Sequence, residues 1–223
     1  NGKTLFAAAI ASYCTFADGE YGARIYFTAP KLEQASLCYE AYYQMISKDE
    51  ELDALAKRRR TDIYVEENNA SAKPLAFSAK KSDGLNISLG VADEFASWEG
   101  DAGLKFYEVL KSSMGARRQP MLLAISTAGY VNEGVYDELL KRCTRMILGS
   151  AGEKKLAPFL YMIDDIEKWK DIEELKKANP NMGVSVTKEY FEAEIAIAES
   201  SLSKRAEFIV KYCNLKQNSA QAW

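Results

Sequence analysis

The sequence Asn1-Gly2-Lys3-Thr4 leads directly into the apolar run 5–10, and the apolar run 87–92 ends in Asp93-Glu94. A glycine before a helix lets the backbone approach a phosphate group, a lysine neutralises its oxygens, and a threonine hydroxyl can bind Mg²⁺. Two carboxylates at the end of a strand can hold that ion and orient an attacking water. In this order, the two stretches predict a nucleoside triphosphate site in an α/β fold.

The predicted site consists of Gly2, Lys3 and Thr4 before Asp93 and Glu94 in the chain. Gly2 would let the backbone approach the phosphates, Lys3 would neutralise the β- and γ-oxygens, and Thr4 would bind Mg²⁺. Asp93 would hold the ion directly or through water, and Glu94 would polarise the attacking water. Taken alone, Gly-Lys-Thr is a common tripeptide before a helix, and an acidic pair is usually a solvated turn. Their order favours catalysis by Lys3 and Glu94, with ATP and Mg²⁺ as cofactors.

Two further motifs are candidates for coupling and for catalysis between subunits. Ser126 and Thr127 follow the apolar run 121–125, where hydroxyls could sense a γ-phosphate; a Ser/Thr-rich strand exit or helix cap is an equal alternative. Arg117 or Arg118 could reach a neighbouring subunit's nucleotide as an arginine finger. Paired arginines more often simply face solvent.

The composition narrows the classes of chemistry. The chain has 223 residues, no histidine and a net charge of −3. The lack of histidine excludes Ser-His-Asp and Cys-His nucleophile systems and histidine-bound metals. Its four cysteines are scattered without a CxxC pair, which indicates reduced core residues rather than a zinc site or a disulfide framework. No apolar run reaches the roughly 20 residues of a membrane-spanning helix, so we expect a cytoplasmic protein with no membrane partner.

Hydrophobic periodicity predicts alternating helices and apolar strands, which is typical of a mostly parallel sheet flanked by helices, with the nucleotide at the carboxyl ends of the strands. After residue 164 the predicted strands stop and helices follow. We therefore expect an ATPase domain at 1–165 and a small helical subdomain at 166–223. The expected helices are 4–16, 33–47, a charged helix ending in the arginine run 57–60, 103–114, 133–147, 166–178, 187–200 and 204–212, and the expected strands are 24–28, 62–65, 75–78, 87–92, 121–125 and 159–163.

An ordered set of motifs resembles the large terminase subunits of tailed double-stranded-DNA bacteriophages. The resemblance spans nearly the whole chain. It is carried by Asn1-Gly2-Lys3-Thr4, Thr28-Ala29-Pro30 with Gln34-Ala35, Asp83-Gly84 with Asp93-Glu94, Arg117-Arg118-Gln119-Pro120 with Ser126-Thr127-Ala128-Gly129, Trp169, Asn179-Pro180 and Asn181-Met182-Gly183.

This resemblance implies a P-loop ATPase with a linker subdomain, the motor that moves double-stranded DNA into a procapsid in the host bacterial cytoplasm. It implies a homo-oligomeric ring on a portal protein, a small terminase subunit as partner, and an endonuclease in the full-length parent. We expect the first half of the phosphate loop to precede residue 1 and the nuclease domain to follow residue 223. Two alternatives stay open: another nucleic-acid translocase or helicase with the same core, and a non-catalytic assembly module with a vestigial nucleotide site.

Overall fold

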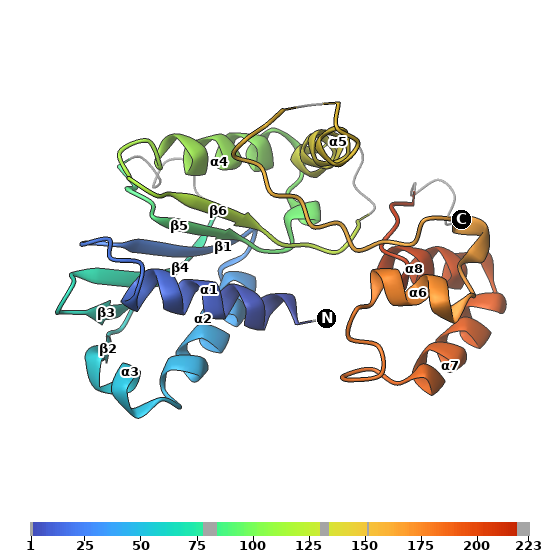
Figure 1. Cartoon of the computed structure of the whole chain (residues 1–223), viewed down its shortest axis with the longest axis horizontal. Helices are drawn as coiled ribbons and strands as arrows, with labels where there is room; N and C mark the ends of the chain where they lie inside the picture. The colour runs from blue at the N-terminus through green and yellow to red at the C-terminus, as the bar shows by residue number, and fades with distance from the viewer. Residues whose placement is uncertain (1, 78–83, 130–133, 151, 218–223) are drawn as a thin grey trace. The chain divides into compact units, whose positions relative to one another are not determined.

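The computed structural model describes residues 2–77, 84–129, 134–150 and 152–217. These residues form two compact units, which divide between Ser126 and Thr127. Figure 1 shows their elements, and each unit is described by itself below. Within the described ranges, no helix is both long and apolar enough to cross a bilayer.

The first unit is built on one sheet with the strand order β2-β3-β4-β1-β5-β6. β1 (Arg24–Ala29) runs parallel to β4 (Ala70–Ala76) and to β5 (Leu89–Ala92), and β5 runs parallel to β6 (Met121–Ala124). β2 (Ala56–Arg58) and β3 (Ile63–Val65) form an antiparallel hairpin beside β4. The predicted mostly parallel sheet flanked by helices is confirmed, and its carboxyl edge contains the ends of β1, β5 and β6.

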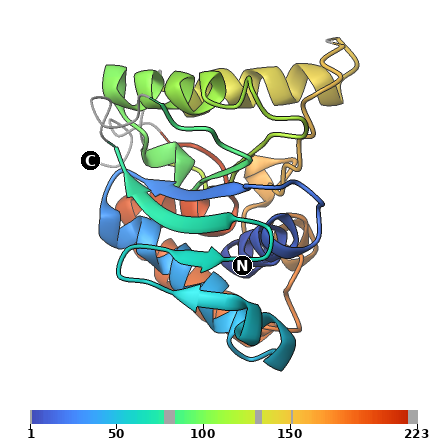
Figure 2. The ribbon, with the colours of Figure 1, turned by 90° about the vertical axis from the view of Figure 1, so that its left-hand side faces the viewer.

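Helices cover both faces of this sheet, as Figure 2 shows. α1 (Lys3–Phe16) and α2 (Leu32–Ile46) lie on one face, and α4 (Gly100–Ser112) lies on the other. The small buried side chains of Ala7, Ala8 and Ala11 allow α1 to pack closely on the sheet core formed by residues such as Ile25 and Phe27. This close packing fixes the start of α1 relative to the strands.

The second unit is mainly helical among its described residues. Its elements are α5 (Val135–Ile147), the 3₁₀ turn η3 (Ile166–Lys168), α6 (Ile172–Ala178), α7 (Lys188–Glu199) and α8 (Leu202–Tyr212). The last three helices enclose a core around Trp169, Leu175 and Phe191. Thr187 caps α7 by accepting a hydrogen bond from the Tyr190 amide, as its position before the helix predicts.

One predicted helix ends earlier than expected, and one predicted strand does not form. The charged helix α3 (Glu50–Leu55) ends before the arginine run, because residues 56–58 pair with β3 instead. Residues 159–163 form no strand, since the Ile163 amide donates to the Cys213 carbonyl and the Tyr161 carbonyl accepts from the Asn214 side chain. In both segments, a tertiary contact overrides the local pattern.

Element boundaries differ elsewhere. β4 begins at Ala70, five residues before the predicted strand 75–78, because Ala70 and Ala72 are buried in the sheet core. The predicted helix 166–178 is interrupted, since the Asp171 carboxylate caps a new helix that starts at Ile172. Residue 78 of one predicted strand and residue 133 of one predicted helix lie outside the described residues.

Candidate nucleotide site

α1 begins with a glycine in a conformation that other residues rarely adopt. Gly2 has φ 88° and ψ −1°, in the left-handed region, and its carbonyl accepts the Phe6 amide at 3.0 Å. Lys3 and Thr4 form the first turn, where the amide groups have no acceptor inside the helix. This helix N-terminus can therefore bind an anion such as a phosphate group. Asn1 lies outside the described residues.

The acidic pair follows β5 directly, and the backbone of Asp93 is fixed from two sides. Its amide donates to the Thr28 carbonyl at 2.9 Å, and its carbonyl accepts from Trp98 Nε1 at 3.0 Å. Asp93 is only 9% exposed, and its side chain accepts the Glu94 amide at 2.8 Å. The first carboxylate is thus held in place at the carboxyl edge of the sheet.

The two carboxyl groups and the Lys3 ammonium influence one another electrostatically. Burial raises the pKa of Asp93, and the nearby positive charge of Lys3 opposes part of that rise. The pKa of Glu94 is also raised by burial and then by the charge of Asp93, and Lys3 lowers it. Lys3, Asp93 and Glu94, which come from distant parts of the sequence, therefore lie close enough at this edge of the sheet for their charges to shift the pKa values of the two carboxyl groups.

Thr28 and Cys38 belong to this neighbourhood, and the sequence analysis missed both as site residues. Thr28, fully buried at the end of β1, donates from its hydroxyl to the Val91 carbonyl at 2.8 Å. The Cys38 sulfur lies 4.0 Å from the Thr4 carbonyl. Burial, with a smaller contribution from the charge of Asp93, raises the pKa of Cys38 to about 12, so its thiol stays protonated at neutral pH. The carboxyl end of β1, adjacent to β5, was the available signal for Thr28.

Ser126 contacts the turn that carries the acidic pair. Its hydroxyl accepts the Ala96 amide at 2.9 Å, and the preceding Ile125 carbonyl accepts the Phe95 amide at 3.2 Å. Ser126 is therefore hydrogen-bonded directly to the turn after Glu94. Thr127 is the first residue of the second unit.

The arginine pair is located at the other edge of the sheet. Arg117 donates to the carbonyls of Gly22 and Asn86, which precede β1 and β5, and to the Glu20 carboxylate at 3.2 Å. Its side chain is 8% exposed, so its guanidinium holds two loops of the fold together. Arg118 is exposed and precedes β6. An arginine-finger role for either residue stays a prediction.

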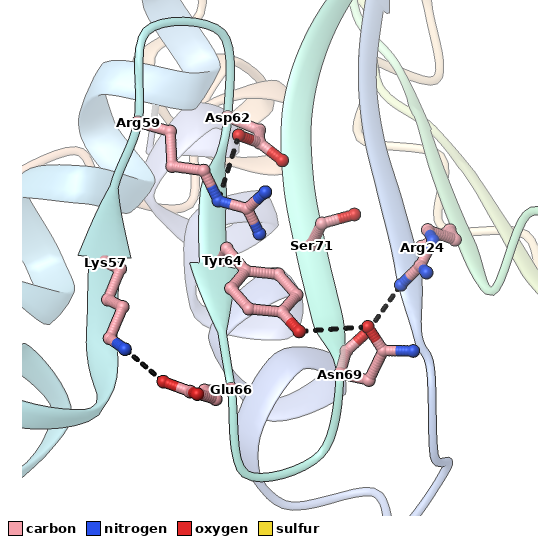
Figure 3. A pocket seen from close by; sticks show the side chains of 8 residues that line it. All are labelled: Arg24, Lys57, Arg59, Asp62, Tyr64, Glu66, Asn69 and Ser71. Carbon is pink, nitrogen blue, oxygen red and sulfur yellow. Dashed lines mark hydrogen bonds and ion pairs between the residues drawn. The ribbon is translucent and has the colours of Figure 1, made fainter.

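A polar hollow of about 550 Å³ also lies at the amino end of β1, away from Lys3 and Asp93 (Figure 3). Its charged groups are largely paired with one another: Lys57 with Glu66, and Arg59 with Asp62. Arg59 also stacks on the Tyr64 ring, 3.7 Å from its centroid. The hollow therefore offers little free positive charge to a triphosphate, and the start of α1 stays the candidate site.

The family model described as the terminase large subunit ATPase domain matches residues 1–145, which include the start of α1, the acidic pair and Ser126. The chain belongs to this terminase family.

A relative and a solved structure place this terminase chain among longer proteins. It is 33% identical over 144 residues to Protein YmfN of Escherichia coli K12, covering 65% of this chain and 31% of that protein. The crystal structure of the HK97 bacteriophage large terminase is similar in fold, with a TM-score of 0.82 and 18% identity over 97% of this chain and 44% of that chain. This terminase chain therefore spans less than half the length of either protein.

Proposed function

We propose that this chain is the motor portion of a phage or prophage large terminase, which couples ATP hydrolysis to movement of double-stranded DNA into a procapsid. The observation that carries the proposal is the mutual influence of Lys3, Asp93 and Glu94 at the carboxyl edge of the sheet. Phosphoryl transfer depends mainly on positioning and charge stabilisation, which this arrangement offers.

Each residue has a defined role in this proposal. Gly2 and the first-turn amides of α1 bind the triphosphate, and Lys3 neutralises its β- and γ-oxygens. Glu94 orients and polarises the attacking water. Mg²⁺, when bound, would neutralise charge on the phosphates, and the Thr4 hydroxyl with the Asp93 carboxylate would hold it. These oxygen donors suit that hard cation.

The acidic pair fits a cation in a second respect. Burial penalises both ionised carboxylates, and Asp93 raises the pKa of Glu94 further. A bound positive charge would relieve this penalty, whereas a purely structural pair at this depth would gain nothing from the repulsion. The raised pKa values are therefore consistent with a cation-binding role for the pair.

The partners follow from the proposed motor. We propose double-stranded DNA as the substrate of translocation, a portal protein and a small terminase subunit as partners, and a homo-oligomeric ring in the host cytoplasm. The full-length parent would also carry an endonuclease. Residues 166–223 would act as the linker between the ATPase domain, residues 1–165, and that nuclease.

The substitution Glu94→Gln in the full-length protein tests the assignment. We expect near-normal Mg-ATP affinity with turnover reduced by roughly 10²–10⁴-fold, the usual contribution of a residue that assists proton transfer. Glu99→Gln is the matched control, because Glu99 is an exposed acid a few residues further along. Hydrolysis at the wild-type rate in Glu94→Gln would remove Glu94 from the mechanism.

The vestigial-site alternative has its own outcome. Wild-type protein that failed to bind Mg-ATP at micromolar to millimolar concentration, the ordinary range for an enzyme's substrate, would support a non-catalytic assembly module. We expect binding that Lys3→Ala abolishes, because the substitution removes the ammonium that opposes the triphosphate charge.

A further inference from the structure

The segment that follows α8, residues 213–217, contacts several parts of the second unit. The buried Cys213 accepts the Ile163 amide through its carbonyl at 3.2 Å. Lys216 donates to both carboxylate oxygens of Asp137 at 2.5 Å, and Asp137 in turn accepts the Gly134 amide at the start of α5. The exit segment is therefore held by α5 and by the extended stretch 159–163.

Asn214 makes the hydrogen bond of this segment that reaches furthest along the sequence. Its Oδ1 accepts the backbone amide of Ala128 at 2.6 Å, and its Nδ2 donates to the Tyr161 carbonyl at 2.7 Å. These partners are 86 and 53 residues away, so the side chain does not serve as a local cap of α8. The side-chain amide of Asn214 thus uses both its acceptor and its donor. Aspartate lacks the donor and leucine lacks both, so neither residue could make the two hydrogen bonds.

The backbone of Asn214 also favours asparagine. Its φ of 55° lies in the left-handed region, where asparagine is tolerated better than most other residues. The conformation and both hydrogen bonds therefore select the same residue type, and the result is a side chain fixed against the Ala128 amide.

Ala128 is connected to the nucleotide site by a very short stretch of chain. Two residues before it, the Ser126 hydroxyl accepts the Ala96 amide in the turn that follows Asp93 and Glu94. Residues 126–128 span at most about 10 Å even when fully extended. The stretch is therefore anchored to the catalytic turn at one end and to Asn214 at the other, and it contains the point where the chain passes between the two units.

We infer that Asn214 is a positioning residue that transmits the state of the nucleotide site, through residues 126–128, to the segment leaving α8. The inference rests on the proposed function, because it requires that nucleotide binding or hydrolysis shifts the turn after Glu94. A shift of this turn displaces Ser126, and the anchored Ala128 passes the displacement to Asn214 and thus to the exit segment.

The test compares Asn214→Gly with the wild-type full-length protein by amide hydrogen exchange, with and without Mg-ATPγS. Glycine keeps the left-handed backbone and removes only the side chain. We expect exchange at residues 213–217 to respond to nucleotide in the wild type and to lose that response in Asn214→Gly. The response of residues 93–97 should persist in the variant. The Ala128 amide should exchange roughly tenfold faster, as expected when a buried hydrogen bond is lost.

Asn69→Gly is the matched control. Asn69 is also a left-handed asparagine, with φ 56°, and its side chain accepts from Tyr64 in the first unit. It should retain the nucleotide response of residues 213–217. Asn214→Asp keeps the acceptor for Ala128 and loses the donor to Tyr161, so it should restore part of the response.

Activity provides a readout that a purely structural role would not change selectively. In Asn214→Gly we expect ATP turnover within about twofold of the wild type and less DNA moved per ATP hydrolysed. The inference is overturned if residues 213–217 ignore nucleotide in an ATP-hydrolysing wild type, or if Asn214→Gly keeps the response. The inference is also overturned if Asn214→Gly loses turnover and melting temperature together, and loses more of both than Asn69→Gly does. Wild-type protein that binds no nucleotide refutes the proposed function itself, and the inference with it.

Discussion

Replacement of Gly103 tests the packing that holds the acidic turn. A Cβ atom at this position would lie 2.7 Å from both the carbonyl carbon and the carbonyl oxygen of Trp98, and 3.1 Å from its Cβ. Trp98 is buried against Phe77, Phe95 and Phe106, and it donates to the Asp93 carbonyl. Gly103→Ala therefore pushes α4 against the backbone that supports Asp93.

Two opposing effects decide the magnitude of this substitution. Alanine in a helix interior is favoured over glycine by about 1 kcal/mol. The contact with the Trp98 backbone acts against this gain, because a backbone atom cannot rotate away as a flexible side chain can. Overpacking of this kind costs about 1–3 kcal/mol. Subtracting the helix gain from this cost leaves a net destabilisation of up to about 2 kcal/mol, or a fall of up to roughly 4–8 °C in melting temperature for a chain of this size.

Urea and thermal unfolding followed by circular dichroism measure the effect. Ala102→Gly is the matched control, because Ala102 is exposed on the same helix and the reverse change there reports only helix propensity. It should cost roughly 0.5–1 kcal/mol. If Gly103→Ala instead stabilised the protein by about the amount that Ala102→Gly costs, the close approach of α4 to Trp98 would be refuted.

Three further predictions concern charge and buried hydrogen bonds. Burial raises the pKa of Asp93 and of Glu94 in the folded protein, so the free energy of unfolding should fall as pH rises from the ordinary carboxyl range through the raised pKa values. Glu94→Gln should flatten this part of a profile of stability against pH. It should also raise the stability of the nucleotide-free protein at neutral pH. Arg117→Ala should cost about 3 kcal/mol in urea unfolding, since it leaves Glu20 without its ion pair, whereas exposed Arg118→Ala should stay within about 0.5 kcal/mol; equal effects would contradict the structural role of Arg117. Asn179→Ala should cost about 1–3 kcal/mol because it removes the donor to the Tyr212 and Leu175 carbonyls, and a neutral result by thermal unfolding would contradict it.

The sequence was informative where the local pattern of apolar residues matches the burial of the element in the structure. The apolar run before Asp93 predicts β5, which is buried along its whole length. The alanine-rich run after Lys3 predicts α1, which buries one face through Ala7, Ala8 and Ala11. The same logic places the ends of parallel strands at one edge, and therefore predicts that Lys3 and the acidic pair come together. Their electrostatic coupling agrees with that expectation.

Long-range contacts explain what the sequence could not predict. Arg58 lies in β2 because it pairs with Glu40 and stacks on Tyr43 of α2, although arginine is a strong helix former. The apolar alternation of 159–163 resembles a strand, but its backbone bonds go to the segment after α8. Side-chain direction is equally invisible in sequence, so nothing predicted that Arg117 would be bound by two loops.

The backbone at Glu94 has a consequence for how this position can vary. With φ 46° and ψ 45°, Glu94 adopts a left-handed conformation that suits glycine, asparagine or aspartate better than glutamate. Random substitution followed by selection for thermal resistance alone should therefore drift away from glutamate here. If Glu94 has the catalytic role proposed above, libraries screened for heat tolerance should accumulate well-folded but inactive proteins at this codon, and only selection for turnover should restore glutamate.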